Sequence, residues 1–256
     1  MFFLAAPGLW ADHLWADQWV KTFTPTGRPE LRLEAAEASI AIVGEDRRDI
    51  EARVTTAGWK ISGNGVQVHE TDGGNRLELE VVTPEINLAV ARHAVKLELK
   101  VPRDIDCELK AGVGAVTVTG VNGKIVLVAK AGTITLLDIN GKLEATTGEG
   151  KIRARGRFDQ LTLGTGYGAV DVEAITGSRM FGAWRISTDA GNVTLHVPPN
   201  FSADLDAQAD AGHITVDLPY TISGTPDQSS IRGKINAGGE ALVLRTLGGS
   251  IKVLAK

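Results

Sequence analysis

The chain has 256 residues, of which 43% are hydrophobic, 30 are glycine and only 9 are proline, so it can bury a sizeable core and is not a disordered polymer. Its formal net charge of −4 and its pI near 5.8 argue against general binding to nucleic acid or to an anionic membrane. A single cysteine excludes an intrachain disulfide and leaves the redox compartment open.

Residues 1–25 have a character of their own. Met1 to Ala11 are mainly apolar and end in small residues, as in a secretory signal, but no positively charged residue precedes them. The stretch is too short to span a bilayer. We interpret residues 1–25 as a signal remnant or an N-terminal anchor segment. Trp10, Trp15 and Trp19 would then attach it peripherally to a membrane or a partner, although packing onto the rest of the domain is the more ordinary fate of such residues.

Residues 26–103 alternate apolar and polar positions, which is the period-2 pattern of half-buried strands. Turn sequences such as Gly63-Asn64-Gly65 and Asp72-Gly73-Gly74-Asn75 separate these runs and favour hairpins. We expect this segment to be a strand-rich cap that covers the open edge of the first coil of a repeat. The apolar runs are Leu31-x-Leu33, Ile40-x-Ile42, Val66-x-Val68, Leu77-x-Leu79-x-Val81 and Val95-x-Leu97-x-Leu99-x-Val101.

Residues 104–256 contain a repeat of the form Gly-x-[Ile/Val]-x-[Ala/Val/Leu]. A second short apolar strand begins nine residues before the Ile or Val of each copy. Such self-similarity predicts stacked units, because one unit cannot bury its apolar face alone. The seven copies are Gly114-Val116-Val118, Gly132-Ile134-Leu136, Gly150-Ile152-Ala154, Gly168-Val170-Val172, Gly191-Val193-Leu195, Gly212-Ile214-Val216 and Gly249-Ile251-Val253, and their upstream partners are Cys107, Ile125, Leu143, Leu161, Trp184, Leu205 and Leu242.

The spacing of the copies predicts the architecture. Every step from Val116 to Val170 is nine residues, so a coil of about 18 residues consists of two halves, each a strand and a turn. Successive coils would place equivalent aliphatic side chains directly above one another. We therefore predict an all-β, single-domain β-solenoid, a flattened parallel β-helix or roll, with the strand-rich cap at its N-terminal end.

The period lengthens after Val170, and the insertions all fall in the same connection of the coil. Repeat proteins often use such an edge for contacts, although an edge free of packing constraint is the plainer interpretation. An exposed cluster of aromatic side chains near an arginine is typical of contact hot spots. The candidate partner-binding residues on this edge are Arg179, Met180, Phe181, Phe201, Tyr220 and Arg232.

The sequence contains no nucleophile elbow, phosphate loop or zinc motif, so no catalytic residue, metal site or cofactor is predicted. Cys107 lies in an inward apolar series and should be a buried, inert thiol. His196 and His213 fall on what should be adjacent coils, but at different positions in their repeats, which does not favour a metal site. The nine-residue half-step resembles a calcium-binding roll, yet its repeated aspartate is missing.

A basic stripe is formed by four alternating cations on one outward strand face. It could bind a polyanion such as an acidic glycan, but a solvated strand face is the more common meaning of such a pattern. Asp171 should lie in register with Arg153, one coil away. The stripe consists of Lys151, Arg153, Arg155 and Arg157.

The repeats resemble the bacterial "putative adhesin" family, a widespread domain of unknown function with repeated Gly-Asp-Ile/Val strands. The resemblance covers about residues 30–256 and is carried by the copies at Gly114, Gly132 and their successors, together with Ser39-Ile40-Ala-Ile42. It implies an exported or envelope-associated β-solenoid without established catalysis. The aspartate that often follows the glycine in the family is replaced in all seven copies here, by Ala115, Thr133, Lys151, Ala169, Asn192, His213 and Ser250.

Three functions are compatible with these observations. The first is a non-enzymatic, adhesin-like interaction module of the periplasm or cell surface, with an unidentified protein or glycan partner and no nucleic acid. The second is an envelope-sensing or regulatory component that docks to a membrane protein through residues 1–25. The third is a carbohydrate-active enzyme, which would need carboxylates that converge in a groove.

Overall fold

The computed structural model describes residues 16–84, 93–223 and 229–256, and these form strands joined by turns. The strands of the first half are β1 (Ala16–Phe23), β2 (Glu30–Glu37), β3 (Ser39–Glu45), β4 (Ile50–Ala57), β5 (Gln67–Asp72), β6 (Arg76–Val82), β7 (Ala94–Pro102), β8 (Asp106–Val113), β9 (Val116–Thr119) and β10 (Asn122–Ala131). Those of the second half are β11 (Ile134–Glu149), β12 (Ile152–Tyr167), β13 (Val170–Ala174), β14 (Trp184–Ala190), β15 (Val193–Val197), β16 (Ala203–Ala209), β17 (Ile214–Asp217), β18 (Tyr220–Ile222), β19 (Ser230–Ile235), β20 (Ala241–Gly248) and β21 (Ile251–Ala255).

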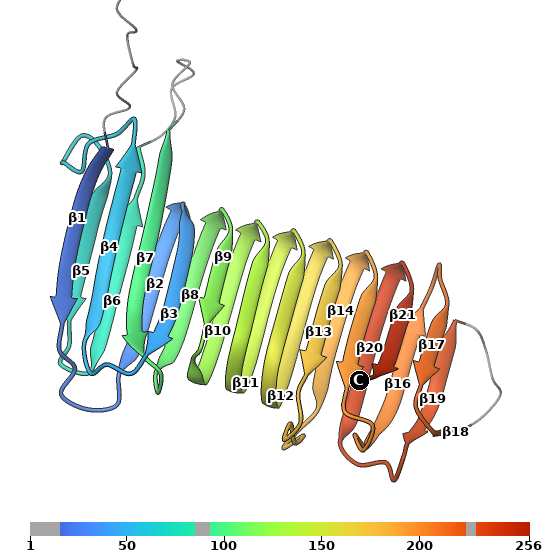
Figure 1. The fold of residues 1–256 in the computed structure, drawn as a ribbon. Coiled ribbons are helices and arrows are strands. Elements are labelled where there is room, and N and C mark those ends of the chain that lie inside the picture. Colours follow the sequence, from blue (N-terminus) through green and yellow to red (C-terminus); the bar gives the residue numbers. More distant parts are fainter. Residues whose placement is uncertain (1–15, 85–92, 224–228) are drawn as a thin grey trace, which may run out of the picture.

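The strands build a flattened solenoid with two layers (Figure 1). The first layer has the order β1-β4-β7-β3-β9-β11-β12-β13-β15-β21-β17. The second layer has the order β5-β6-β2-β8-β10-β11-β12-β14-β20-β16-β19-β18. The long strands β11 and β12 turn a corner and contribute to both layers, so the sheet is continuous.

The register confirms the predicted 18-residue coil. In the first layer Val116 pairs with Ile134, Ile134 with Ile152 and Ile152 with Val170, all in parallel. The second layer has the equivalent parallel series Cys107, Ile125, Leu143 and Leu161. The two series face inward and are almost inaccessible to solvent. Burial of these stacked aliphatic side chains is the main force that holds coil to coil.

The glycine before each first-layer strand of the repeat motif allows the coils to approach closely. Gly150 has a φ of 131°, a value that residues with a Cβ rarely adopt. A Cβ at this position would lie 2.1 Å from the carbonyl oxygen of Gly132, the equivalent residue of the coil before it. The glycines therefore serve both the turn and the packing of neighbouring turns.

A ladder of buried threonines runs beside these glycines. Thr147, Thr165, Thr188 and Thr246 pair with one another along the second layer, and each is at most 5% exposed. The hydroxyl of Thr188 donates to the carbonyl of Gly168 at 2.8 Å, and Thr165 and Thr246 make the same bond to the carbonyls of Gly150 and Gly191. These hydroxyls satisfy buried carbonyl groups at the turns.

The N-terminal strands differ from the expected cap. The hairpin prediction is confirmed for the antiparallel pair β5 and β6, and β4 is likewise antiparallel to β7. However, β2 and β3 form a coil of the solenoid itself, since β2 pairs in parallel with β8 and β3 with β9. This coil lies between the β6–β7 coil and the β8–β9 coil. The predicted boundary between a cap and a solenoid at residues 103 and 104 is therefore not a structural boundary. Strands from both sides of it pair with one another in the same stack.

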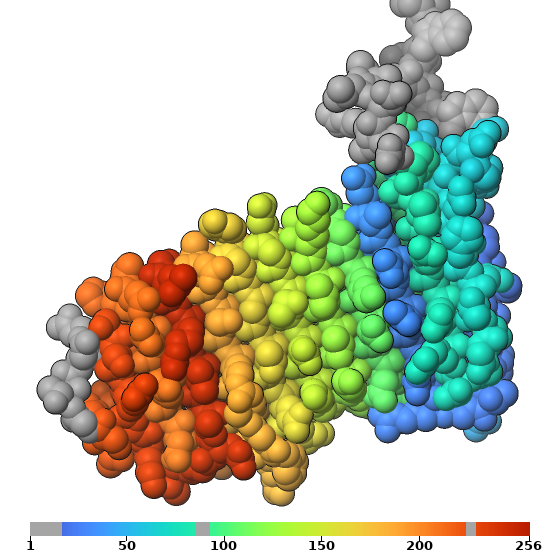
Figure 2. Space-filling view, turned by 180° about the vertical axis from the view of Figure 1, so that it is seen from behind, coloured from blue at the N-terminus to red at the C-terminus, as the bar shows by residue number. Residues whose placement is uncertain are grey.

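The C-terminal strands are also interleaved, which the sequence analysis did not foresee. β20 pairs with β14 on one side and with β16 on the other, and β21 lies in the same way between β15 and β17. The last coil of the chain is thus inserted before the coil of β16 and β17 (Figure 1). Figure 2 shows the opposite side of the stack, on which the coils follow one another as bands from one end to the other.

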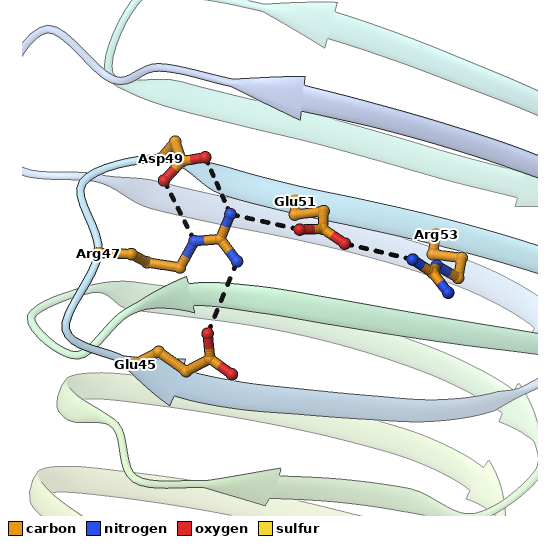
Figure 3. A network of polar contacts seen from close by, with 5 residues as sticks. All are labelled: Glu45, Arg47, Asp49, Glu51 and Arg53. Atoms are coloured by element: carbon orange, nitrogen blue, oxygen red, sulfur yellow. Dashed lines mark hydrogen bonds and ion pairs between the residues drawn. The ribbon is translucent and has the colours of Figure 1, made fainter.

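An ion-pair network stabilises the reversal between β3 and β4 (Figure 3). The Arg47 side chain is only 16% exposed and binds both carboxylate oxygens of Asp49, at 3.2 and 2.9 Å. Arg47 also contacts Glu45 and Glu51, and Glu51 contacts Arg53. A fork-shaped guanidinium bound by two oxygens holds the turn in one geometry. The hydrogen bond from Arg47 lowers the pKa of Asp49.

Candidate functional site

The predicted insertions form a groove along the lower edge of the stack in Figure 1. We call it the lower-edge groove. Its volume is about 680 Å³, and it lies between the connection that follows β13, the turn that precedes β16 and the turn that precedes β20. Its lining residues are Thr176, Gly177, Ser178, Arg179, Met180, Pro198, Asn200, Phe201, Ser202, Gly239 and Glu240.

Hydrogen bonds brace one wall of the groove. The Ser178 hydroxyl donates to the carbonyl of Ile175 at 2.8 Å and accepts from the backbone N–H of Phe158 at 3.2 Å. The backbone N–H of Phe181 donates to the carbonyl of Asp159 at 2.9 Å. The inserted loop that carries Arg179 and Met180 is therefore tied at both ends to β12.

The opposite wall is braced by Asn236. Its amide nitrogen donates to the carbonyls of Pro199 and Phe201, at 3.0 and 2.8 Å. Asn236 has a φ of 50°, a conformation that asparagine tolerates better than most residues. The carboxylate of Asp204 accepts a hydrogen bond from the N–H of Gly239 at 3.1 Å, which fixes the turn beside Glu240. The groove is thus formed before any partner binds.

The structure brings together three of the six candidate residues. Arg179 and Met180 line the groove, the first exposed and the second half-buried. Phe201 also lines it, but its side chain is 6% exposed and packs against Trp184, with ring centroids 5.4 Å apart. The prediction of an exposed aromatic at position 201 is therefore wrong, because Phe201 belongs to an aromatic core with Trp184 and Phe158.

The other three candidates lie outside the lining of the groove. Phe181 is 66% exposed beside it. Tyr220 lies on β18, and Arg232 lies on β19, where it contacts Asp206 at 3.4 Å. The polar residues Ser178, Asn236 and Glu240 were missed by the sequence analysis. The only signal for them was their place in the insertions.

Most of the basic stripe is neutralised. Lys151 contacts Asp171 at 2.5 Å, Arg155 contacts Asp138 and Glu173, and Arg157 contacts Asp159. Arg153 pairs in register with Asp171, as predicted. Carboxylates on adjacent coils and on β12 itself thus offset most of the positive field that a polyanion would need.

The two histidines of the second half are not on adjacent coils. His196 pairs with Leu254 of β21, which lies between β15 and β17, and His213 precedes β17. The expectation of adjacent coils was wrong because it assumed that coils stack in chain order. Within residues 16–84, 93–223 and 229–256, no group of three or more His, Cys, Asp or Glu residues could hold a metal ion.

Cys107 is buried, as predicted. Its side chain lies in the inward series of the second layer, and burial raises the pKa of its thiol to about 12. A thiol with so high a pKa and no access to solvent is a packing residue.

A carbohydrate-active enzyme would need carboxylates that converge in a groove. The outer surface of the stack has a second groove, with a volume of about 470 Å³. It crosses β6, β2, β8 and β10 on the outside of the second layer. Arg76 binds Glu30 at 2.8 Å and Arg28 binds Asp106 at 3.0 Å, so these two carboxylates are engaged by arginine. The arrangement resembles the cross-strand ion pairs of a sheet surface.

Part of the predicted N-terminal anchor segment belongs to the sheet. Residues 16–23 form β1, which pairs antiparallel with β4, and Trp19 packs against the core. Trp10 and Trp15 lie outside the described residues. In the part of the chain that the structure describes, no helix is long and apolar enough to cross a membrane.

The chain belongs to the Toastrack DUF4097 family, whose model matches residues 29–254. This confirms the family resemblance inferred from the repeats. No curated protein matches the chain.

Solved structures with a similar fold include a "putative cell adhesion protein" from Clostridium sporogenes, which is 14% identical, with 93% of this chain and 99% of that chain covered and a TM-score of 0.45. A "putative adhesin" from Bacteroides fragilis is 13% identical, with 93% and 97% covered and a TM-score of 0.43. A "putative lipid binding protein" from Parabacteroides distasonis is 10% identical, with 92% and 96% covered and a TM-score of 0.41. At such identities and TM-scores, these names do not transfer to the chain.

Proposed function

We propose that the protein is a non-enzymatic interaction module of the bacterial cell envelope or cell surface, and that the lower-edge groove binds its protein or glycan partner. The observation that carries the proposal is the construction of the groove. Its two walls come from separate insertions into the stack, and both are held by hydrogen bonds to ordered strands. A preformed site loses little conformational entropy when a partner binds.

The lining of the groove suits a partner with both apolar and polar groups. Met180 offers an adaptable apolar side chain, and Arg179 and Glu240 offer charges of opposite sign. Phe201 closes the base from the core side. An apolar base with charged groups around it is the usual composition of a contact surface with one or two dominant residues.

Export is supported by the sequence alone, through the apolar stretch from Met1 to Ala11, which lies outside the described residues. Fractionation of the source bacterium, with mass spectrometry of the mature protein, tests this part. We expect the protein in the envelope or extracellular fraction. Recovery of the intact chain from the cytoplasm alone would contradict it.

The groove is tested by binding of the purified protein to envelope fractions of the source bacterium and to a panel of envelope glycans. We expect saturable binding that falls by about tenfold or more in Met180→Glu, which places a carboxylate in the apolar part of the groove and costs about 1.4 kcal/mol or more.

The matched control for this variant is Val128→Glu, because Val128 is 51% exposed on β10 and does not line the groove. Equal binding by the wild-type protein and Met180→Glu would remove the groove from the proposal. Turnover of any glycan in the panel would contradict a non-enzymatic role.

A further inference from the structure

The lower-edge groove contains two charged side chains that have no counter-ion. Arg179 lies on the wall formed by the inserted loop after β13, and Glu240 lies on the opposite wall, in the turn that precedes β20. Both are exposed, and among the described residues neither side chain forms an ion pair or a hydrogen bond. The groove therefore presents a positive group on one wall and a negative group on the other.

Charged residues close to the groove behave differently. Arg157 and Asp159, on the strand to which the inserted loop is tied, contact each other at 2.9 Å. Arg245 of β20 contacts Asp206 of β16 at 2.7 Å. Arg179 and Glu240 are kept apart because each belongs to a wall that is braced separately, through Ser178 and through the turn at Gly239. A ligand with both charges can bridge them.

Neutral polar side chains lie on the same two walls. Thr176 lies on the wall of Arg179, and Asn200 and Ser202 lie on the opposite wall. In the part of the chain that the structure describes, these three side chains make no hydrogen bond, so their donors and acceptors are open to a ligand. Met180 and Phe201 supply the apolar part of the lining.

The size of the groove favours a small ligand. Its volume of about 680 Å³ falls within the range of about 300–1,000 Å³ that is usual for sites of small ligands. A stable interface between folded proteins buries about 800 Å² on each partner, which requires a broader surface.

We propose that the lower-edge groove binds a short peptide that carries both a free carboxylate and a free ammonium group. The proposal rests on the function proposed above for this groove and specifies its ligand. The guanidinium of Arg179 donates two parallel hydrogen bonds to the carboxylate, and the carboxylate of Glu240 accepts from the ammonium group. Thr176, Asn200 and Ser202 pair with the amide groups between the two charges.

Other ligand classes match the lining less well. A neutral glycan leaves both charges without a partner, and an acidic glycan pairs with Arg179 but is repelled by Glu240. The headgroup of a zwitterionic phospholipid carries both charges. It brings two acyl chains, however, for which the lining offers only Met180, Pro198 and Phe201.

Retention of tripeptides by the full-length protein tests the proposal. The probe is an equimolar library of tripeptides with free ends, and mass spectrometry identifies the peptides that are retained. We expect retention of the free library, and a loss of about tenfold in affinity when the amino end is acetylated or the carboxyl end is amidated.

Two variants assign each end of the peptide to one wall. In Arg179→Gln, amidation should cause no further loss, whereas acetylation should still cost about tenfold. The reverse should hold in Glu240→Gln, because each variant removes the partner of one end only. Arg48→Gln and Glu37→Gln are the matched controls, since both positions are exposed and lie outside the groove. The controls should respond to both blocking groups as the wild-type protein does.

Equal retention of the free and blocked libraries, or no retention of either, would overturn the peptide as ligand. The groove itself would survive that result if Met180→Glu still weakened binding to envelope fractions or glycans, so the two proposals can fail separately. Binding to phosphatidylethanolamine vesicles that is lost in both Arg179→Gln and Glu240→Gln, with no retention of the library, would replace the peptide by a lipid headgroup.

Discussion

At the scale of single residues, glycine sets how closely the coils can stack. The contact at Gly150 recurs at Gly132, Gly168 and Gly191, where a Cβ would also lie about 2 Å from a glycine carbonyl of the neighbouring coil. A side chain at any of these positions would force two backbones apart. Threonine hydroxyls donate to two of these carbonyls, those of Gly150 and Gly168, from the inside of the coil.

Gly150→Ala should therefore destabilise the protein by about 3 kcal/mol, from the strained φ and the contact with Gly132 together. The matched control is Gly164→Ala on β12, where a Cβ would meet only side-chain atoms at 3.5 Å or more. We expect that control to change the free energy of unfolding by less than about 1 kcal/mol. Denaturant unfolding of both variants measures the difference, and equal effects would refute a packing role for the ladder.

Cys107 should not react with iodoacetamide at pH 8 in the folded protein, because burial keeps the thiol protonated and out of contact with the reagent. When the protein is unfolded in about 6 M guanidinium chloride, Cys107 should react fully. Mass spectrometry counts the modified chains. Rapid modification of the folded protein would show that the second layer opens at β8.

The sequence could predict these residue roles where they depend on position in the repeat. The inward place of Cys107 and the need for glycine at Gly150 both follow from the period. The exposure of Phe201 was predicted wrongly because Phe201 lies in an insertion, where the repeat period does not indicate which side chains face the core. Its burial depends on a tertiary contact with Trp184, which the local sequence does not reveal.

At the scale of elements, the turn between β3 and β4 is where the chain leaves the solenoid coil and starts an antiparallel strand. Arg47 holds this turn through Asp49. The hydrogen bond from Arg47 places the pKa of Asp49 in the folded protein below its ordinary value. The ion pair is therefore fully stabilising above that ordinary value, and its contribution is lost as the pH falls through the lower pKa of the folded protein.

Arg47→Ala should accordingly lower the free energy of unfolding at pH 7, and the loss should shrink as the pH is lowered below the ordinary pKa of an aspartate. Arg48→Ala serves as the control, because Arg48 is exposed and next in the chain. Chemical denaturation of both variants across pH 2.5–7, roughly the range in which carboxylates titrate, provides the comparison. A loss in Arg47→Ala that does not vary with pH would show that the carboxylates contribute little.

For the strands that carry the repeat motif, the sequence predicted both the secondary structure and the pairing. For the strands without the motif, it predicted the secondary structure but not the strands with which they pair. Alternation identified β2 and β3 as strands. It could not show that they form a coil between β6–β7 and β8–β9, because strand pairing over long sequence distances leaves no mark in the local pattern. The same reason kept Asn236 and Glu240 out of the predicted site.

At the scale of the whole molecule, the order of coils in space differs from their order in the chain at both ends. The coil of β2 and β3 is inserted near the N-terminal end, and the coil of β20 and β21 is inserted near the C-terminal end. Each inserted coil is paired on both sides. The last residues of the chain are therefore interior strands of the sheet, and the edge strands come from earlier segments.

This arrangement explains how the C-terminal end comes to carry the lower-edge groove. The turns that lead into β16 and into β20 lie next to each other because β20 pairs with β16, and together they form one wall of the lower-edge groove. The same insertion displaces β17 to the end of the first layer. The proposed partner site thus arises from a single feature of the topology.

Hydrogen exchange followed by mass spectrometry tests the interleaved stack most directly. Chain ends usually fray and exchange quickly. We predict instead that residues 241–255 exchange as slowly as residues 184–197, and far more slowly than the edge strands β17 and β18. Exchange of residues 241–255 as fast as that of β17 and β18 would contradict the inserted coil and, with it, the account of the groove.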